Sequence, residues 1–308
     1  MKLQELIPEL YEDYHDLMTK GYIGRAVKLS KEYSALLGTP FYFSHTEKPH
    51  YPVRNFDAQT VFVHLNPGVN LGQINSLEDF HAQKWDKENY YNEFNLPYNA
   101  SLDQVIEKYC YFWQQYAYKR FEIDKVKDNF DYKQACFLLH WPDSGIELIN
   151  GNLKDVQIQK QNSINVIDQK LQLELFPYGS NTISTHLLDD VFSKKPELIT
   201  PFIERILNII DLYPRKYVLF GSRVYDTLFR MYDNRISKII EYISPEEKFK
   251  NITTKSLAFT LIRLKWNGRL INAGIAHSFP RRDLPNAYEK MAEYGRMCHK
   301  TYNKFLNS

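Results

Sequence analysis

The chain has 308 residues, of which 44% are hydrophobic and 25% are charged, as is usual for a globular protein with ample material for a core. Its 39 Lys and Arg against 37 Asp and Glu give a net charge of +2, so any contact with nucleic acid must come from a local basic patch. The three cysteines, Cys110, Cys136 and Cys298, form no CxxC pair, which argues against zinc sites, iron–sulfur sites and a disulfide framework.

The N-terminus is acidic and amphipathic and lacks the apolar core of a signal peptide. No run of about 18 apolar residues is found, so we expect a cytoplasmic protein without a membrane span. The stretch "SHTEKPH" holds His45 and His50 at a spacing unsuited to a metal, and "NPGVNLG" lacks the GxGxxG pattern of a dinucleotide site. We therefore expect no metal and no cofactor.

Helical and strand-like patterns alternate along the chain. Helical spacing of apolar residues predicts two helices within 1–37 that are separated at Gly21, a helix over 102–121 capped by Ser101, and helices near 131–140, 184–193, 198–212 and 284–305. Short apolar runs predict strands at 60–65, 171–176 and 216–221. Two more strand-like runs flank Asn267-Gly268, which is typical of a tight hairpin turn, and 152–170 is expected to be a loop or hairpin.

This alternation predicts an α/β protein with a mainly parallel sheet. Ligands of such sheets bind outside the carboxyl ends of the strands. The predicted ends carry turn-forming and polar residues, in the order Asn66-Pro67-Gly68, Phe176-Pro177-Tyr178, Gly221-Ser222 and His277-Ser278-Phe279-Pro280.

Taken in order, these ends resemble the uracil-DNA glycosylase superfamily, and most closely its mismatch-specific and single-strand-selective branches. "HLNPG" matches the Asn-Pro-Gly motif of the family's first strand, and "HSFPRR" is similar to its late His-Pro-Ser-Pro-Arg motif. The resemblance covers about 56–305. It implies a three-layer α/β/α sandwich around a four-stranded, mainly parallel sheet, in one domain over 1–308 with N-terminal helices (1–50) and a helical insertion (about 75–170).

The resemblance also implies a chemistry for the residues that match. Cleavage of an N-glycosidic bond develops positive charge on the sugar and negative charge on the leaving base. Asn66, on a turn formed by Pro67 and Gly68, would orient the attacking water beside the sugar, and His277 would donate a hydrogen bond to the base oxygen that gains charge. Pro67 and Gly68 are also candidate base-binding residues. Each also has a plain alternative, since Asn66 can bond its own backbone and His277 can be a structural residue.

The loop after His277 would hold DNA while the base is flipped out. Ser278, Arg281 and Arg282 are its candidate DNA contacts, and a solvated arginine pair is the alternative. DNA, single-stranded or mismatched, is therefore the expected partner.

The predicted base-reading position departs from the family. Where the family often has an Asn three residues before a Pro, this chain has Glu174 three residues before Pro177. Glu174 and Phe176 are the candidate base-binding residues of this strand end. An Asn both donates and accepts, whereas an ionised Glu only accepts. Glu174 would therefore suit a base edge with two donors, or would be protonated, or it lies outside the base site.

Two other functional classes compete with the glycosylase hypothesis. A serine hydrolase would use Ser222, but "LFGSRV" lacks the GxSxG pattern, and Ser222 is better explained as a helix N-cap. A catalytically silent glycosylase-like fold that binds nucleic acid, a nucleotide or a protein is the stronger alternative, because a fold does not determine an activity.

Overall fold

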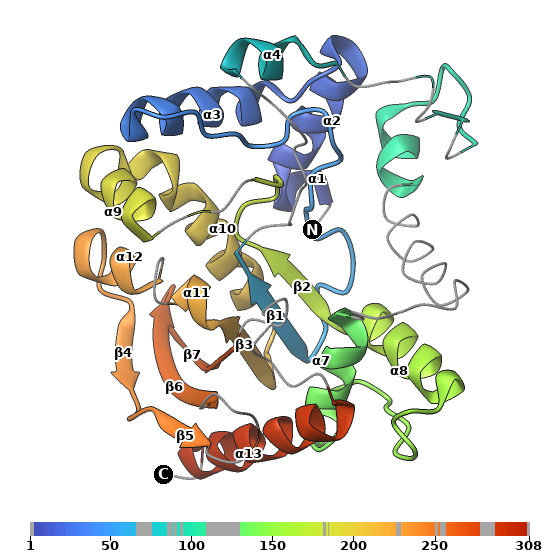
Figure 1. Ribbon diagram of the computed structural model, residues 1–308, viewed down its shortest axis with the longest axis vertical. Coiled ribbons are helices and arrows are strands. Elements are labelled where there is room, and N and C mark those ends of the chain that lie inside the picture. The colour runs from blue at the N-terminus through green and yellow to red at the C-terminus, as the bar shows by residue number, and fades with distance from the viewer. Residues whose placement is uncertain are drawn as a thin grey trace. The chain divides into compact units, whose positions relative to one another are not determined.

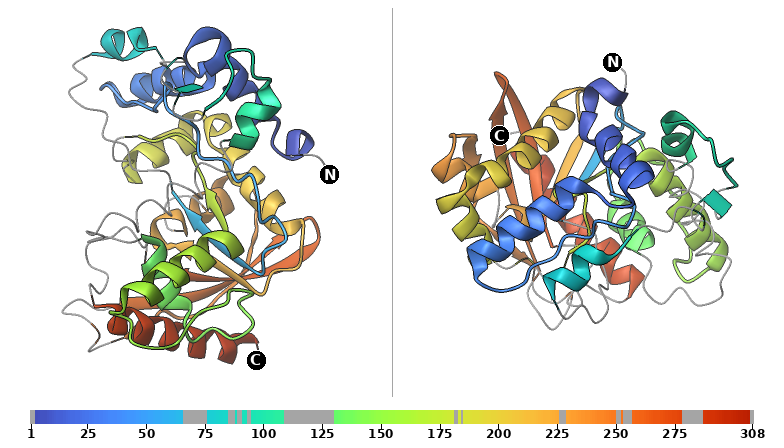
Figure 2. Two further views of the ribbon diagram at one scale, coloured as in Figure 1. Left: turned by 90° about the vertical axis from the view of Figure 1, so that its right-hand side faces the viewer. Right: turned by 90° about the horizontal axis from the view of Figure 1, so that it is seen from above.

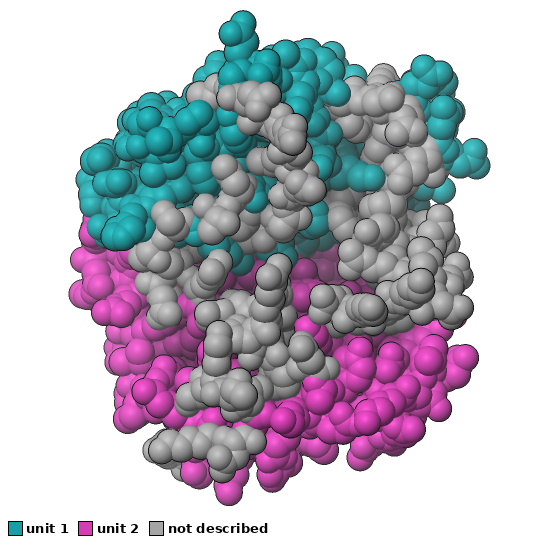
Figure 3. Space-filling model, in the orientation of Figure 1, with its two compact units in different colours: residues 1–53, 65–113, 174–205 teal, residues 54–64, 114–173, 206–308 magenta. Residues whose placement is uncertain are grey.

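A computed structural model of the chain describes residues 3–65, 76–84, 88, 91–92, 95–108, 130–180, 183, 185–225, 229–249, 252, 257–277 and 287–306. These residues belong to two compact units, each built from three stretches of the chain (Figure 3). Unit 1 takes its residues from 1–53, 65–113 and 174–205, and unit 2 from 54–64, 114–173 and 206–308. No helix within the described ranges is long and apolar enough to cross a membrane.

Unit 2 contains a mixed sheet with helices around it (Figure 1), so the chain is an α/β protein. Among the described residues the sheet has seven strands, in the order β2-β1-β3-β7-β6-β4, with β5 paired to β6. Their bounds are β1 Thr60–His64, β2 Leu171–Glu174, β3 Tyr217–Gly221, β4 Ile240–Ile243, β5 Glu247–Phe249, β6 Leu257–Trp266 and β7 Arg269–Ala276. Strands β1 and β3 are buried along their whole length, as central parallel strands usually are.

The β6–β7 hairpin makes the sheet mixed. Asn267 and Gly268 connect the two strands and have φ angles of 47° and 79°, the left-handed pair that a tight hairpin turn needs. The predicted hairpin is therefore confirmed. A two-residue turn joins only antiparallel strands, and β4 and β5 also pair antiparallel to β6. The four-stranded sheet that the resemblance implies is wrong in number. Both hairpin strands join the three parallel ones, and β4 and β5, which are too short and too exposed to give a sequence pattern, add two more.

Unit 2 also contains the helices α7 (Phe130–Leu138), α8 (Val156–Gln169), α11 (Ser222–Val224), α12 (Arg230–Arg235) and α13 (Tyr288–Leu306). Three of these helices, α7, α8 and α13, pack into one core that is rich in aromatic residues. Helix α7 contacts both α8 and α13 (Figures 1 and 2). A Cβ atom on Gly295 would lie 1.8 Å from the Phe137 carbonyl oxygen, so only glycine allows α13 to approach α7 this closely.

Two local predictions in unit 2 need correction. Residues 152–170, expected as loop or hairpin, contain α8, whose first turn is capped by the Asp155 side chain through the amides of Gln157 (2.8 Å) and Ile158 (3.3 Å). Its polar sequence hides the helical period, because only part of one face is buried. Ser222 is the first residue of α11 and not its N-cap, which is Gly221.

Unit 1 is mainly helical among its described residues. It contains α1 (Leu3–Leu6), α2 (Pro8–Lys20), α3 (Gly24–Leu37), α4 (Leu77–Ala82), α9 (Thr185–Lys194), the 3-10 helix η1 (Pro196–Leu198) and the first half of α10 (Thr200–Asp211), the rest of which belongs to unit 2. The break predicted at Gly21 ends α2. The cap predicted at Ser101 is confirmed, because its Oγ accepts from the amide of Gln104 at 3.3 Å.

Side chains of α3 hold the Pro- and aromatic-rich loop that follows it. Ser34 Oγ accepts from the Phe41 amide and Ser30 Oγ accepts from the Phe43 amide, both at 2.8 Å. The same loop pairs with the segment after β2, where the Ser44 amide donates to the Gly179 carbonyl oxygen at 2.7 Å. Loop and segment are thereby fixed beside each other within unit 1.

Candidate functional site

The carboxyl ends of three parallel strands in unit 2 are level with one another. Val63 pairs with Phe220, and in the next pairing Gly221 is aligned with Ala276. Continuing the register by one residue places His64, Gly221 and Ala276 in one row at this edge of the sheet. With neighbouring strands about 4.8 Å apart, the outer two backbones of the row are about 10 Å apart.

His277 follows β7 directly at this edge and is half-buried. Its backbone amide donates to Tyr294 Oη at 3.1 Å, and this hydroxyl donates to the Ala258 carbonyl oxygen of β6 at 2.8 Å. The two rings also meet edge to face, with centroids 6.4 Å apart. Tyr294 of α13 therefore fixes the backbone from which the His277 side chain projects.

Six of the predicted site residues lie outside the described residues: Asn66, Pro67, Gly68, Ser278, Arg281 and Arg282. In sequence, the first three follow β1 after Leu65, and the last three follow His277. Their predicted roles stay predictions.

Glu174 and Phe176 belong to unit 1, at the end of β2 and just after it. Glu174 is 9% exposed, and Arg205 donates to the Leu175 carbonyl oxygen at 2.9 Å, which fixes the backbone of this strand end. The Phe176 ring is fully buried, with the rings of Phe202 and Phe43 at 5.1 and 5.3 Å. These are the surroundings of a core residue, and its base-binding role stays a prediction.

Four side chains of unit 2 form a chain of polar contacts, the polar chain, which runs from Asp131 through Lys170 and Gln134 to His64. The sequence gives little sign of it. Gln134 Nε2 lies 3.2 Å from His64 Nε2, and Lys170 Nζ contacts Gln134 Oε1 and lies 2.7 Å from Asp131 Oδ1. His64, Gln134 and Lys170 are 6%, 0% and 5% exposed. The signal that was available is one histidine in an apolar strand directly before Asn-Pro-Gly; its partners, 70 or more residues later along the chain, could not be inferred.

Burial sets the charge of this histidine. Burial and, to a smaller extent, the nearby positive charge of Lys170 together lower the pKa of His64 to about 3. The imidazole is therefore neutral at physiological pH. Asp131 offsets the Lys170 charge, so the polar chain brings little net charge into the core of unit 2.

Unit 1 has its own buried polar cluster, around Asp13 of α2. The hydroxyls of Tyr51 and Tyr178 both donate to Asp13 Oδ2, at 2.7 and 2.6 Å, and Arg25 Nε lies 3.6 Å from Oδ1. Burial raises the pKa of Asp13 to about 6, although the bonds from the two tyrosines and the Arg25 charge act to lower it. The cluster joins α2, α3, the loop after α3 and the segment after β2.

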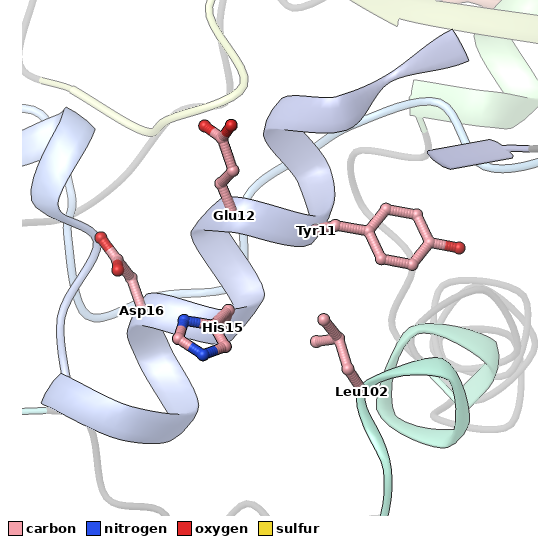
Figure 4. A pocket seen from close by; sticks show the side chains of 5 residues that line it. All are labelled: Tyr11, Glu12, His15, Asp16 and Leu102. Atoms are coloured by element: carbon pink, nitrogen blue, oxygen red, sulfur yellow. The ribbon is translucent and has the colours of Figure 1, made fainter. Parts of the chain in front are cut away.

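An open pocket of about 450 Å³ also lies on unit 1, lined by Tyr11, Glu12, His15 and Asp16 of α2 and by Leu102 (Figure 4). Both of its carboxylates already have partners. Glu12 pairs with Arg25, and Asp16 pairs with Lys20 at 2.6 Å and accepts from the Gly24 amide at 3.0 Å. None of the predicted site residues lines this pocket, and we assign no chemistry to it.

No three His, Cys, Asp or Glu side chains come together as possible metal ligands within the described ranges. The chain matches no protein-family model, no curated protein and no solved structure.

Proposed function

We propose that the chain is a DNA glycosylase of the uracil-DNA glycosylase type, built as a three-layer α/β/α sandwich. It would hydrolyse the N-glycosidic bond of a damaged or deaminated base that has been flipped out of DNA. The observation that carries the proposal is the row of level strand ends in unit 2: His277 follows β7, and the sequence Asn66-Pro67-Gly68 follows β1. Parallel strands with ligand-type residues at their carboxyl ends are where sheets of this class bind small molecules.

The proposed roles follow from the chemistry of the side chains. Asn66 orients a water molecule towards the sugar, with Pro67 and Gly68 shaping its turn beside the base. His277 donates to the base oxygen that gains negative charge, and a fixed donor of this kind stabilises the transition state more than the substrate. The bonds that hold its backbone to Tyr294 support this role, because they reduce the reorganisation needed during the reaction.

The decisive experiment measures release of free base by the purified full-length protein. The substrates are single-stranded and mismatched oligonucleotides that carry uracil, hypoxanthine or xanthine. We expect release from at least one of them, with the His277→Ala variant much slower on the same substrate. If no base is released above the background without protein, the glycosylase proposal fails and the catalytically silent fold replaces it.

DNA binding is expected to depend on Arg281 and Arg282, because the net charge of the chain is only +2. Changing both to Ala should weaken binding. It should also make the slope of log affinity against log salt concentration less negative by about 1–2, the value for one or two lost phosphate contacts. The measurement is a fluorescence-anisotropy titration of a labelled oligonucleotide at several salt concentrations.

A matched pair at the other end of the hairpin strands serves as control. Lys265 and Arg269 flank the β6–β7 turn, and their side chains are 57% and 67% exposed. Changing both to Ala removes the same charge and should leave the slope unaltered. Equal slopes for wild type and the Arg281/Arg282 double variant would show that this loop does not touch phosphate.

A further inference from the structure

Hydrogen-bond donors and acceptors in the polar chain fix the direction of the Gln134 amide. A lysine ammonium only donates, so the Gln134 atom that contacts Lys170 must be the carbonyl oxygen Oε1. The amide nitrogen Nε2 therefore faces His64 and donates to the ring nitrogen Nε2 at 3.2 Å. That ring nitrogen is the acceptor, and a neutral imidazole must then carry its proton on Nδ1.

Aromatic rings and paired charges keep this arrangement in place. The His64 ring lies parallel to the Phe62 ring at 6.3 Å and edge to face with Phe130 at 5.1 Å. Phe130 also lies 5.4 Å from Lys170 Nζ. The charged groups of the polar chain are those of Lys170 and Asp131, which pair with each other. A second positive charge on the ring would lie close to Lys170 in an apolar environment and would be strongly disfavoured.

We infer that His64 is a positioning residue of the site: an uncharged imidazole, held as the Nδ1–H tautomer by Asp131, Lys170 and Gln134, that fixes the end of β1 from which Asn66 follows. When the register is continued by one residue, the His64 backbone occupies the first place in the row of level strand ends, beside Gly221. Its role towards Asn66 rests on the proposed function, whereas its tautomer does not.

The absence of charge on the ring matters for the proposed chemistry. Loss of a base leaves positive charge on the sugar, and an imidazolium near it would raise the barrier. A neutral ring provides the same rigid support without that penalty. Within the polar chain, His64 therefore forms a hydrogen bond but carries no charge.

The state of the ring can be measured on the full-length protein, without any activity. Histidine rings labelled with ¹⁵N report their tautomer and charge in long-range ¹H–¹⁵N spectra, and the His64→Gln variant identifies the signals of His64. We expect the neutral Nδ1–H form, unchanged from pH 5 to pH 8. A wild-type ring that is charged at pH 6, or that carries its proton on Nε2, overturns the inference.

Gln134→Glu tests the cause of the tautomer. The new carboxylate only accepts, so it would bond to Lys170 and to a proton on His64 Nε2, and the ring should switch tautomer. Gln157→Glu, at an exposed position in the first turn of α8, adds the same charge and should leave the His64 signals unchanged. If Gln134→Glu does not fold, the wild-type spectrum still tests the tautomer and the charge of His64. If the variant folds and its His64 ring keeps the Nδ1–H tautomer, the inference is contradicted.

The positioning role has a separate readout in base release. Gln134→Glu should lower kcat by about 10²-fold with little change in KM, and should add a loss of rate at low pH as the ring becomes able to take up a proton. Wild-type rates should show no ionisation from His64. If wild type releases base and the switched variant matches it in rate and pH profile, the positioning role is wrong. If wild type releases none, the proposed function fails while the spectrum still reports the ring.

Discussion

Replacement of Asn66 by Ala is expected to slow base release by about 10²–10³-fold on the true substrate. The amide is proposed to orient the attacking water, and such a contact is made fully only when the glycosidic bond is breaking. The loss should therefore appear mainly in kcat, with KM little changed. Single-turnover rates with excess protein measure the chemical step directly.

Glu174→Gln provides the comparison for this variant. Glu174 is proposed to read the base, so its change should alter which base is released more than how fast the best substrate reacts. Glu174→Asn should shift the preference towards uracil, because an amide offers a donor beside an acceptor. An Asn66→Ala variant that keeps the wild-type rate while folded by circular dichroism would remove Asn66 from the mechanism.

Acidification is expected to stabilise unit 1 through Asp13. The pKa of this carboxyl is about 6 in the folded protein and 3.8 in its unperturbed state, so the folded state binds the proton more tightly. The contribution of Asp13 to the free energy of unfolding therefore increases as the pH falls from about 6 to about 4, by roughly 2–3 kcal/mol. Above this range the carboxylate is charged in both states and the contribution is lost.

Asp13→Asn isolates this effect, because the amide oxygen can still accept from Tyr51 and Tyr178 but does not titrate. Urea unfolding at a series of pH values should show the wild type gaining stability relative to Asp13→Asn towards pH 4. Glu32→Gln is a control of opposite sign, because Lys195 lowers the pKa of Glu32 and its contribution is lost on acidification. A wild-type minus Asp13→Asn difference that stays constant with pH would contradict the prediction.

Local patterns predicted much of the fold. The Asn267-Gly268 turn could be predicted from two residues, and the buried strands β1 and β3 from short, mostly apolar runs, because these signals lie within a few adjacent positions. Strands β4 and β5 gave no such signal: of their residues only Phe249 is buried, and they form because the longer β6 offers them an edge. Pairing with a distant strand is a tertiary effect that propensity does not contain.

Residues of the candidate site could be predicted only where they stand next to strand ends. His277 was identified because it follows an apolar run, and the structure puts it directly after β7. The polar contacts of His64 were missed because its partners Gln134 and Lys170 come from α7 and from the residue before β2. Contacts between such separate segments are decided by the packing of whole elements, and no spacing in the sequence records them.

The interleaving of the two units has a consequence for the order in which the protein folds. Each unit is made of three stretches that alternate with those of the other, so no single cut in the chain yields either unit intact. Strand β1 lies between β2 and β3, so its pairing needs residues made more than 100 positions later, and β3 in turn pairs with β7. To form native contacts between such distant residues, the chain must first lose the conformational entropy of a large loop, and only then gains the energy of the contacts. This order makes folding slow. On a translating ribosome, the apolar strand β1 is therefore made long before its partners, and it would depend on chaperones or on transient partners of its own chain in the meantime.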